Sequence, residues 1–574
     1  MKKDILTAFG EVVTPFKTPP GPLWFLSPRT ILPSLFLAPS HIKIRPMRHF
    51  IVATALGLSS LPLLLGLTVD PQFIYLIALF GPLAIRAVID YTQTRHAILR
   101  NFPLIGHFRY IFEAIRPEIQ QYFVENDSNG SPFNREERSV IYQRAKNVID
   151  ALPFGSKFDH YHKGHEWLNH SMVPLRPESS FPKIKIGGPH CQRPYDASLL
   201  NISAMSFGSL SANAILALNW AAKEGGFAHN TGEGSISPYH TEKKGDLIWQ
   251  LGTGYFGCRN PKGDFDGEMF REKIQAHPTV KMIEIKISQG AKPGHGGILP
   301  GRKVTPEVAA IRGVPQGQTV HSPPYHKAFK TPLELLDFIE HLRELSGSLP
   351  IGIKLCVGRK SEFLSLCKAM LMRQTYPDFI AVDGSEGGTG AAPLEFANSI
   401  GHPLNDGLSF IHSALTACDL RRHIKIIASG RVITGFDLLK RLVLGADLCY
   451  AARSMMFSLG CIQALRCHKN DCPAGVATQR KTLTSGLVPE VKFKRVANFH
   501  RATLESLFEM MAAAGLVHPS QLRPYHIQKR LNDREIKHYG EIYTFLEKGD
   551  FDKGLAPVAW MSSWEKAKAE SFCP

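Results

Sequence analysis

The sequence predicts a parallel α/β fold, a (β/α)8 TIM barrel, for the middle of the chain, and three observations support this prediction. From about Gly187 onward, short runs of β-branched residues alternate with amphipathic helical patterns, which is the signature of parallel strands joined by helices. Several predicted strands end in Gly-rich or polar loops, which build the active site in such barrels. The length of 574 residues leaves room for additions at both ends of a barrel.

One helix and the strand after it can be read directly from residues 331–356. Thr331 is suited to cap a helix that has Pro332 at its first position, and Glu334 completes a capping box. A strand at 351–356 follows. Further elements are predicted as strands at 379–383, 424–428 and 447–451, and as helices near 362–372 and 436–444.

Two uncharged apolar runs lie near the N-terminus. Residues 51–67 approach the ~20 residues that cross a bilayer, and residues 73–85 would need their flanks to complete a crossing. Basic residues lie outside both runs: Lys43, Arg45, Arg48, Arg86, Arg95 and Arg100. Their positions predict a transmembrane hairpin in the inner (cytoplasmic) membrane, with both ends and the catalytic domain in the cytoplasm. A pair of buried or interfacial core helices is the alternative, favoured by Pro62 and by the short second run.

Composition limits the classes of function. The chain is 44% hydrophobic and 20% charged, as expected for a packed globular protein. Its formal charge of +17 could suit nucleic acid, but we find no basic run interleaved with aromatics and no zinc-finger or helix-turn-helix spacing, so we expect no nucleic-acid partner. Anionic lipid headgroups and an anionic cofactor or substrate explain the charge better. Ten unevenly spread cysteines do not suit a disulfide scaffold and indicate a reducing compartment.

These patterns predict five regions along the chain. They are a basic N-terminal leader at 1–50, a probable transmembrane hairpin at 51–95, a linker and cap at 96–186, the barrel with a cysteine loop at 187–480, and a C-terminal helical extension at 481–574. We expect the chemistry in the fourth region, because the polar strand ends and the clustered cysteines lie there.

Three cysteines lie close together in the spacing Cys461-x5-Cys467-x4-Cys472, and Pro473 follows them. Three thiolates this close in sequence could ligate iron. Zinc, with His468 as a fourth ligand, is one alternative, and three unligated buried cysteines are another.

A Gly-rich loop at 384–390 follows the strand predicted at 379–383. Glycines let backbone N–H groups approach a phosphate, so this loop is a candidate for phosphate binding. The pair Gly430-Arg431 repeats this chemistry after the next strand, late in the strand order, where such barrels bind phosphate. A plain turn is the alternative.

Buried or clustered lysines and arginines form two further candidate sites. Lys354 lies at the end of the strand predicted at 351–356, where a cation needs a charged partner. A reduced flavin would be such a partner, and a structural carboxylate is the alternative. Lys292 and Arg312, together with Lys286, suit a dicarboxylate substrate, and a solvated basic loop is the alternative for them.

At five places the sequence resembles the synthase domain of glutamate synthases, which bind FMN. The matching motifs are SAMSFGSLS at 203–211, NTGEG at 230–234, QGAKPGHGGILPG at 289–301, DGSEGGTGAAP at 383–393 and CIQALRCHKNDCPAGVATQ at 461–479. Together they cover roughly residues 190–480, about half of the chain. Chance does not order five such motifs.

The resemblance implies an FMN-dependent oxidoreductase that makes L-glutamate from 2-oxoglutarate, ammonia and two electrons, with hydride passing from the flavin to 2-iminoglutarate. It implies a 3Fe-4S cluster held by Cys461, Cys467 and Cys472. The residues that it places around FMN are Met205, Ser206, Lys354, Gly387, Gly388, Thr389, Gly430, Arg431, Ala452 and Arg453. It implies substrate binding by Met205, Lys292 and Arg312, and catalytic roles for Glu233, Lys292 and Lys354, with Glu233 where ammonia arrives.

Two positions depart from the family pattern, because Ile298 stands where Gln is usual and His295 where Glu is usual. These changes favour an alternative, an FMN-dependent oxidoreductase acting on another amino or keto acid, such as an N-methylglutamate synthase-like subunit. A non-catalytic electron-transfer or scaffold subunit is a further alternative. We expect no glutaminase domain, since residue 2 is Lys, and we find no GxGxxG pattern for NADPH. We therefore expect an external electron donor, namely ferredoxin, a reductase subunit or the membrane quinone pool.

Overall fold

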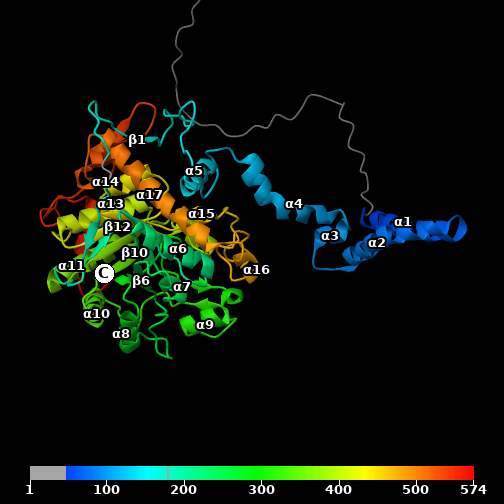
Figure 1. Cartoon of the computed structure of the whole chain (residues 1–574), viewed down its shortest axis with the longest axis horizontal. Coiled ribbons are helices and arrows are strands. Elements are labelled where there is room, and N and C mark those ends of the chain that lie inside the picture. The colour runs from blue at the N-terminus through cyan, green and yellow to red at the C-terminus, as the bar shows by residue number, and fades with distance from the viewer. Residues whose placement is uncertain (1–46, 178–179, 574) are drawn as a thin grey trace, which may run out of the picture. The chain divides into compact units, whose positions relative to one another are not determined.

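The computed structural model describes residues 47–177 and 180–573 and divides the chain into two compact units, Met1–Pro117 and Glu118–Pro574 (Figure 1). The predicted basic leader at 1–50 lies outside the described residues, apart from its last four positions. The division of the chain into five regions stays a prediction.

The first unit is helical. Its elements are α1 (Met47–Thr68), η1 (Pro71–Leu76), α2 (Ile77–Thr92), α3 (Ala97–Asn101) and α4 (Gly106–Ile119). The helices α1 and α2, blue in Figure 1, pack against each other, and the Asp70 side chain begins η1 by accepting a hydrogen bond from the Gln72 N–H at 2.8 Å. The stretches Met47–Thr68 and Pro71–Thr92 are both long and apolar enough to cross a membrane. The residues on either side of the second apolar run, 73–85, therefore extend it to a length that can cross a membrane.

A buried carboxylate ties the end of α2 to the start of α4. Asp90 is fully buried, and its oxygens lie 3.0 Å from Arg86 Nη2 and 2.8 Å from His107 Nε2. It also accepts a hydrogen bond from the Leu104 N–H at 3.0 Å. Because a buried carboxylate is costly without partners, these contacts fix the turn between the two helices.

The helix α4 carries an exposed apolar stripe. Phe108, Ile111, Phe112 and Ile115 recur at helical spacing, and between 42% and 63% of each residue is exposed. The charged residues recur on another face of the helix: Arg109, Glu113 and Arg116. This part of the first unit is thus amphipathic, with an exposed apolar side.

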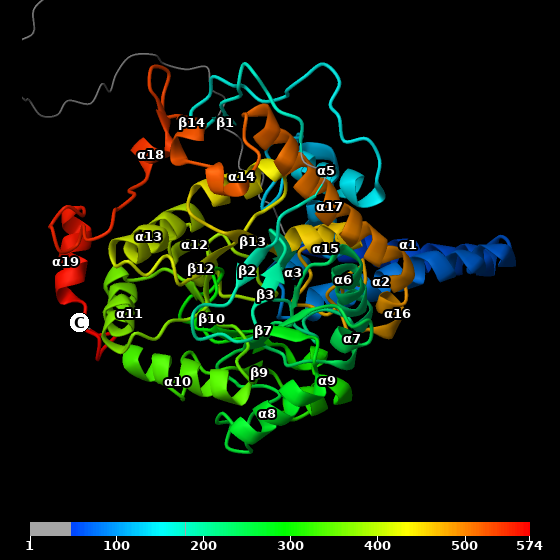
Figure 2. The same cartoon turned by 60° about the vertical axis from the view of Figure 1, so that its left-hand side comes forward.

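The second unit is built on a closed barrel of parallel strands, which confirms the predicted fold class. The order around the barrel is β4-β5-β6-β7-β10-β11-β12-β13, and β13 pairs with β4 to close it. These strands are β4 (Leu200–Ile202), β5 (His229–Asn230), β6 (Leu247–Leu251), β7 (Val280–Lys286), β10 (Ile351–Cys356), β11 (Phe379–Asp383), β12 (Lys425–Ser429) and β13 (Leu448–Ala451). The helices around them in Figure 2 include α6 (Ala212–Gly225), α8 (Gly267–Ala276), α10 (Pro332–Leu345), α11 (Lys360–Arg373), α13 (Leu404–Ala417) and α14 (Gly435–Val443).

The capping box expected at the start of α10 is confirmed. The Thr331 hydroxyl accepts a hydrogen bond from the Glu334 N–H at 3.2 Å, and the Glu334 carboxylate accepts one from the Thr331 N–H at 3.2 Å. The strands β10 and β11 have their predicted bounds, whereas β12 begins and ends one residue later than expected. The helix α14 begins one residue early because Thr434 caps it, again with a capping box.

The lower part of the barrel interior is a packed apolar core. It contains the fully buried side chains of Ile248, Met282 and Phe379, and the hairpin of β2 (Ile184–Ile186) and β3 (Tyr195–Ala197) packs into the same cluster. A Cβ added at Gly352 would lie 2.5 Å from the Phe379 ring, so the glycine lets two strands approach closely. Charged residues gather at the opposite, C-terminal ends of the strands, where barrels of this type place their active sites.

Segments from both ends of the second unit cover the barrel. The helix α17 (Pro489–Ala513) packs against α6, α14 and α5 (Arg135–Lys146). The strand β1 (Glu166–Leu168) pairs with β14 (Ile527–Arg530), which pairs with β15 (Ile536–His538). The region predicted as a C-terminal helical extension therefore contains two short strands as well as α17 and α19 (Val558–Lys566).

We expect Gly352→Ala to destabilise the barrel by about 1–3 kcal/mol, because overpacking a filled core has costs of this size. The added methyl group would meet the Phe379 ring. Thermal unfolding of the purified protein measures the effect. Gly358→Ala is the matched control, since it adds the same group where none of the described residues lies within 4 Å. Equal unfolding temperatures for the two variants would contradict the packing described for the barrel interior.

Candidate active site

A cavity of about 450 Å³ lies at the C-terminal ends of the barrel strands, within the usual size range of small-molecule sites. Its wall is formed by the residues that end or follow β4, β5, β7, β10, β11, β12 and β13. It contains every residue singled out from the sequence as a site residue: Met205, Ser206, Glu233, Lys292, Arg312, Lys354, Gly387, Gly388, Thr389, Gly430, Arg431, Ala452, Arg453, Cys461, Cys467 and Cys472. The fold thus brings these residues together, and their individual roles stay predictions.

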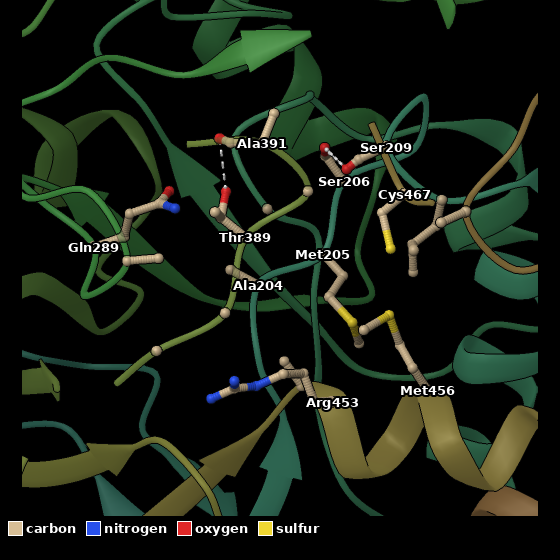
Figure 3. Close-up of a pocket in the computed structure, with 18 of the residues that line it drawn as sticks. Ala204, Met205, Ser206, Ser209, Gln289, Thr389, Ala391, Arg453, Met456 and Cys467 are labelled. Carbon is tan, nitrogen blue, oxygen red and sulfur yellow. Dashed lines mark hydrogen bonds between the residues drawn. The ribbon is translucent and has the colours of Figure 1, made fainter. Parts of the chain in front are cut away.

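One part of the cavity wall is rich in sulfur. Figure 3 shows the side chains of Met205 and Met456 pointing toward each other, next to Cys467, and all three line the cavity. Opposite them, the Thr389 hydroxyl donates a hydrogen bond to the Ala391 carbonyl oxygen at 3.3 Å. Flexible, polarisable methionines of this kind pack well against an aromatic ring system.

Another part of the wall buries three cations around one carboxylate. Lys286 Nζ lies 2.9 Å from Glu233 Oε1. Burial alone would raise the pKa of the Glu233 carboxyl, but the charges of Lys286, Arg312 and Lys292 lower it below its ordinary value. Burial, and then the nearby charge of Lys286, lower the pKa of Lys292 to about 8. This cation wall carries an excess of positive charge that an anionic ligand would balance.

Backbone carbonyls hold two of these cations in place. Lys292 Nζ donates a hydrogen bond to the Ala391 carbonyl oxygen at 2.8 Å. Arg312 Nη2 donates to the Phe207 carbonyl oxygen at 2.9 Å and to Ser206 Oγ at 3.1 Å. The buried Arg312 Nε has no hydrogen-bond partner among the described residues. The two side chains are therefore fixed in direction but keep donors free for a ligand.

Lys354 is buried at the end of β10 and pairs with a carboxylate. Its Nζ lies 3.3 Å from Asp383 Oδ2. Burial alone would lower the pKa of Lys354. The carboxylates of Asp383 and Glu284 act in the opposite direction and outweigh burial, so the pKa of Lys354 lies above its ordinary value. Glu284 is itself fully buried and accepts hydrogen bonds from Asn230 at 2.9 Å and Gln250 at 2.6 Å. The carboxylate partner weighed from the sequence is present, and Lys354 still lines the cavity.

Two turns at the strand ends bring the backbone close to the cavity. A Cβ added at Gly388 would lie 2.8 Å from Arg453 Cδ, so a side chain there would clash. Gly430 has a φ of +152°, and the next residue, Arg431, has a φ of +37°, which is uncommon for a residue with a side chain. These conformations leave backbone N–H groups accessible, as phosphate-binding turns require.

Two arginines stand beside these turns and share one aromatic ring. Arg431 Nη2 lies 2.7 Å from Glu137 Oε1, and Arg453 Nη2 donates to the Glu386 carbonyl oxygen at 2.6 Å. The Phe133 ring centre lies 5.1 Å from Arg431 Cζ and 4.8 Å from Arg453 Cζ. Burial, and then the charge of Arg431, lower the pKa of Arg453 to about 10. The pair is a second concentration of positive charge, separate from the cation wall.

The residues that cover this arginine pair were missed from the sequence. The Phe133 N–H donates to Gln463 Oε1 at 3.2 Å, and Gln463 Nε2 donates back to the Phe133 carbonyl oxygen at 3.0 Å. Glu137 belongs to a capping box with Asn134 at the start of α5, which is a readable local signal. The position of this segment over the cavity cannot be predicted from the sequence, because Gln463, which binds Phe133, lies 330 residues away.

The three clustered cysteines are free thiols on the cavity wall. Burial, with Cys467 and Cys472 nearby, raises the pKa of Cys461 to about 12. The Tyr142 hydroxyl donates a hydrogen bond to the Cys461 carbonyl oxygen at 2.6 Å, which holds the loop against α5. Within residues 47–177 and 180–573, no group of three or more His, Cys, Asp or Glu side chains is placed to hold a metal ion. The metal-binding role of these cysteines stays a prediction.

Comparison with known proteins decides the family. Residues 183–517 match the family described as the conserved region in glutamate synthase. The glutamate synthase large subunit-like protein YerD of Bacillus subtilis is 39% identical over 488 residues, which cover 78% of this chain and 92% of that protein. The chain belongs to the glutamate synthase family. Glutamate synthases are oxidoreductases, so the prediction of an enzyme of this class is confirmed.

Other similarities are weaker or cover less of the matched protein. The archaeal glutamate synthase (NADPH) of Methanocaldococcus jannaschii is 35% identical over 343 residues, which cover 59% of this chain and 64% of that protein. The match thus spans less than two thirds of that relative. Among solved structures, mandelate oxidase with (S)-4-hydroxymandelic acid is 14% identical, with a TM-score of 0.39, covering 74% of this chain and 98% of that chain.

Proposed function

We propose that the protein forms L-glutamate by reductive amination of 2-oxoglutarate with ammonia, with FMN and a 3Fe-4S cluster as its redox groups. The observation that carries this proposal is that a single cavity combines a wall of buried cations, two glycine turns beside an arginine pair, and three thiols. A dicarboxylate, a flavin phosphate and an iron–sulfur cluster are the groups that suit these three walls.

The residues around the arginine pair fit FMN. A Cβ at Gly388 would fill the space beside Arg453, and the φ of Gly430 opens the second turn, so both backbones can approach a phosphate. Bound there, FMN would supply hydride transfer to the substrate. The residues proposed to hold it are Met205, Ser206, Lys354, Gly387, Gly388, Thr389, Gly430, Arg431, Ala452 and Arg453.

The chemistry of the cysteine loop, three sulfur donors close in sequence, suits an iron–sulfur cluster. Cys461, Cys467 and Cys472 line one wall, and burial raises the pKa of both Cys461 and Cys467. Three cysteine sulfurs on one wall are the ligand type that iron–sulfur clusters use. A cluster held there would supply single electrons to the cavity.

The cation wall fits the dicarboxylate. Lys292 and Arg312 would bind its carboxylates, because both are buried and carry donors without carboxylate partners within hydrogen-bond distance among the described residues. Met205 would border the same substrate. The Glu233 carboxylate stays ionised, since the surrounding cations lower its pKa, and can therefore accept hydrogen bonds from ammonium.

The side chains also account for the proton transfers. Condensation of ammonia with the keto group forms a carbon–nitrogen double bond and releases water, so the departing hydroxyl needs a proton. Lys292, with a pKa of about 8, can give that proton and take one back near neutral pH. Lys354 keeps its positive charge and can balance negative charge that develops beside it. Transfer of a hydride to the resulting iminium carbon completes L-glutamate.

One feature of the wall favours the second candidate, an FMN-dependent oxidoreductase for another amino or keto acid. Ile298 lines the cavity and presents an apolar surface where the family pattern has an amide. His295, the second departure from the family pattern, does not support this candidate in the same way, because its ring packs edge-on against Phe396 with the centroids 5.2 Å apart. A substrate with an apolar substituent would pack against Ile298 better than a substrate with a second carboxylate would.

We also propose that the first unit anchors the enzyme in the inner membrane, with the barrel in the cytoplasm. Only 17% and 11% of the most apolar stretches of the two candidate spans are buried, whereas the core helices of a soluble protein are mostly buried. The exposed stripe of α4 adds apolar surface next to these spans in the sequence. Electrons would come from an external donor, which is ferredoxin, a reductase subunit or the quinone pool.

Anaerobic turnover tests the proposed reaction. When the detergent-purified protein is chemically reduced and mixed with 2-oxoglutarate and ammonium, we expect flavin absorbance to return as glutamate forms in equal amount. Lys292→Met should slow this step about 100-fold, because the loss of a charged contact costs roughly 3 kcal/mol. Lys262→Met removes an exposed lysine and is the control. Flavin that stays reduced, or is reoxidised only by another keto acid, would contradict 2-oxoglutarate as substrate, and protein without flavin would refute the proposal.

The affinity for 2-oxoglutarate should depend on pH through Lys292. Its pKa of about 8 means that it is charged below this pH and loses its charge above it, so an anion binds with constant affinity below and more weakly above. We expect the Kd of the oxidised protein to rise by up to about tenfold per pH unit above this pKa. Calorimetric titration at several pH values measures it. Lys292→Met should bind more weakly and lose the pH dependence, whereas a wild-type Kd that stays constant across this range would contradict the assignment.

A further inference from the structure

A buried lysine outside the cation wall lies beside the cysteine loop. Lys303 ends the short helix η3 (Gly301–Lys303), and only 2% of it is exposed. Its Nζ donates hydrogen bonds to the carbonyl oxygens of Ser209 and Ala477, both at 2.8 Å. Lys303 lines the same cavity as Cys467 and Cys472.

The contacts of Lys303 leave its charge without a counter-ion. Among the described residues, no Asp or Glu oxygen lies within salt-bridge distance of its Nζ. Two of its three N–H donors are used by the backbone carbonyls, and the third is available toward its surroundings. Ala477, one of the two carbonyl partners, belongs to the segment that follows Cys472, and Lys303 lines the cavity together with Cys467 and Cys472. A buried ammonium in this position needs negative charge from a partner.

Other basic residues near the loop are exposed or already have a carboxylate partner, and the buried Arg138 lies 3.6 Å from Glu125 Oε2. Lys469 lies on the loop itself and is exposed. Arg302 is exposed and donates to the Lys469 carbonyl oxygen at 3.3 Å, and Arg466 lies 3.7 Å from Asp471. Exposed charges are screened by water and salt, whereas a buried charge acts at nearly full strength on a neighbouring group.

We propose that Lys303 is the counter-charge of the cysteine loop, which offsets the negative charge of the thiolates and thereby raises the reduction potential of an iron–sulfur cluster bound there. This inference rests on the proposed function, because it needs the cluster. Reduction would add negative charge to such a cluster, and a fixed buried ammonium would offset part of that charge. Lys303 is in this sense a positioning and tuning residue, and it does not itself react.

The test replaces the charge while keeping a hydrogen-bond donor. Lys303→Gln removes the positive charge but leaves an amide that can still donate to one of the two carbonyls. We expect the midpoint potential of the cluster to fall by at least the equivalent of a tenfold change in a one-electron equilibrium, about 59 mV. Potentiometric titration of the full-length protein, followed by electron paramagnetic resonance, measures this potential independently of turnover.

Two variants serve as controls. Lys469→Met removes an exposed charge from the same loop and should leave the potential unchanged. Lys303→Arg keeps a positive charge at the buried position and should keep the potential closer to that of the wild type than Lys303→Gln does. Iron and sulfide contents are measured for each protein before its titration.

The outcomes separate this inference from the proposed function. Wild-type protein without iron and sulfide would refute the proposed cluster, and the role of Lys303 with it. A cluster whose potential is the same in Lys303→Gln as in the wild type, or shifts equally in Lys469→Met, would overturn the role of Lys303 alone. If Lys303→Gln binds no cluster but Lys303→Arg does, the charge is needed for binding and the proposal is supported. If neither variant binds a cluster, the lysine serves packing and the proposal is overturned.

Discussion

Uncompensated positive charge, buried at the C-terminal end of the barrel, is the constraint on which the site depends. The charges of Lys292 and Arg312 act on Glu233, whose carboxylate pairs with Lys286, and Lys303 lines the same cavity as Cys467 and Cys472. Charges removed from water are costly unless an opposite charge is near, so this cavity is built for anions. The apolar core beneath it supplies the rigid base, because packed strands hold each cation at a strand end. Substrate, flavin phosphate and cluster would each supply the missing negative charge.

The cover of the cavity connects two of these sites. Phe133 lies against both arginines of the proposed phosphate site, and its backbone exchanges hydrogen bonds with Gln463 in the cysteine loop. Tyr142 holds the same loop through the Cys461 carbonyl oxygen. One short segment of the second unit thus touches both the arginine pair and the cysteine loop, so that the arrangement of one constrains the other. Excluding water from this space strengthens every charge interaction in it.

The sequence was a reliable guide where the signal is local. The capping box at Thr331 and the short β-branched runs allowed the bounds of β10 and β11 to be predicted, and the five motifs contain part of the cavity wall, including Glu233, Lys292 and the three cysteines. It was a poor guide where a contact joins distant segments. Phe133 and Gln463 carry no pattern that relates them, and the burial of Lys303 between Ser209 and Ala477 follows only from the closed barrel. A carboxylate partner for Lys354 could be considered from the sequence, but its identity, Asp383, could not, because it depends on the register of β10 and β11.

The most direct test of this account is an experimental structure of the full-length protein in lipid nanodiscs, purified without air and supplied with 2-oxoglutarate. The account predicts flavin density with its phosphate between the two glycine turns and the arginine pair, a dicarboxylate against Lys292 and Arg312, and a cluster of several irons at the three cysteines. A cavity that holds no flavin, or a dicarboxylate bound away from the cation wall, would contradict the central claim that buried positive charge organises this site.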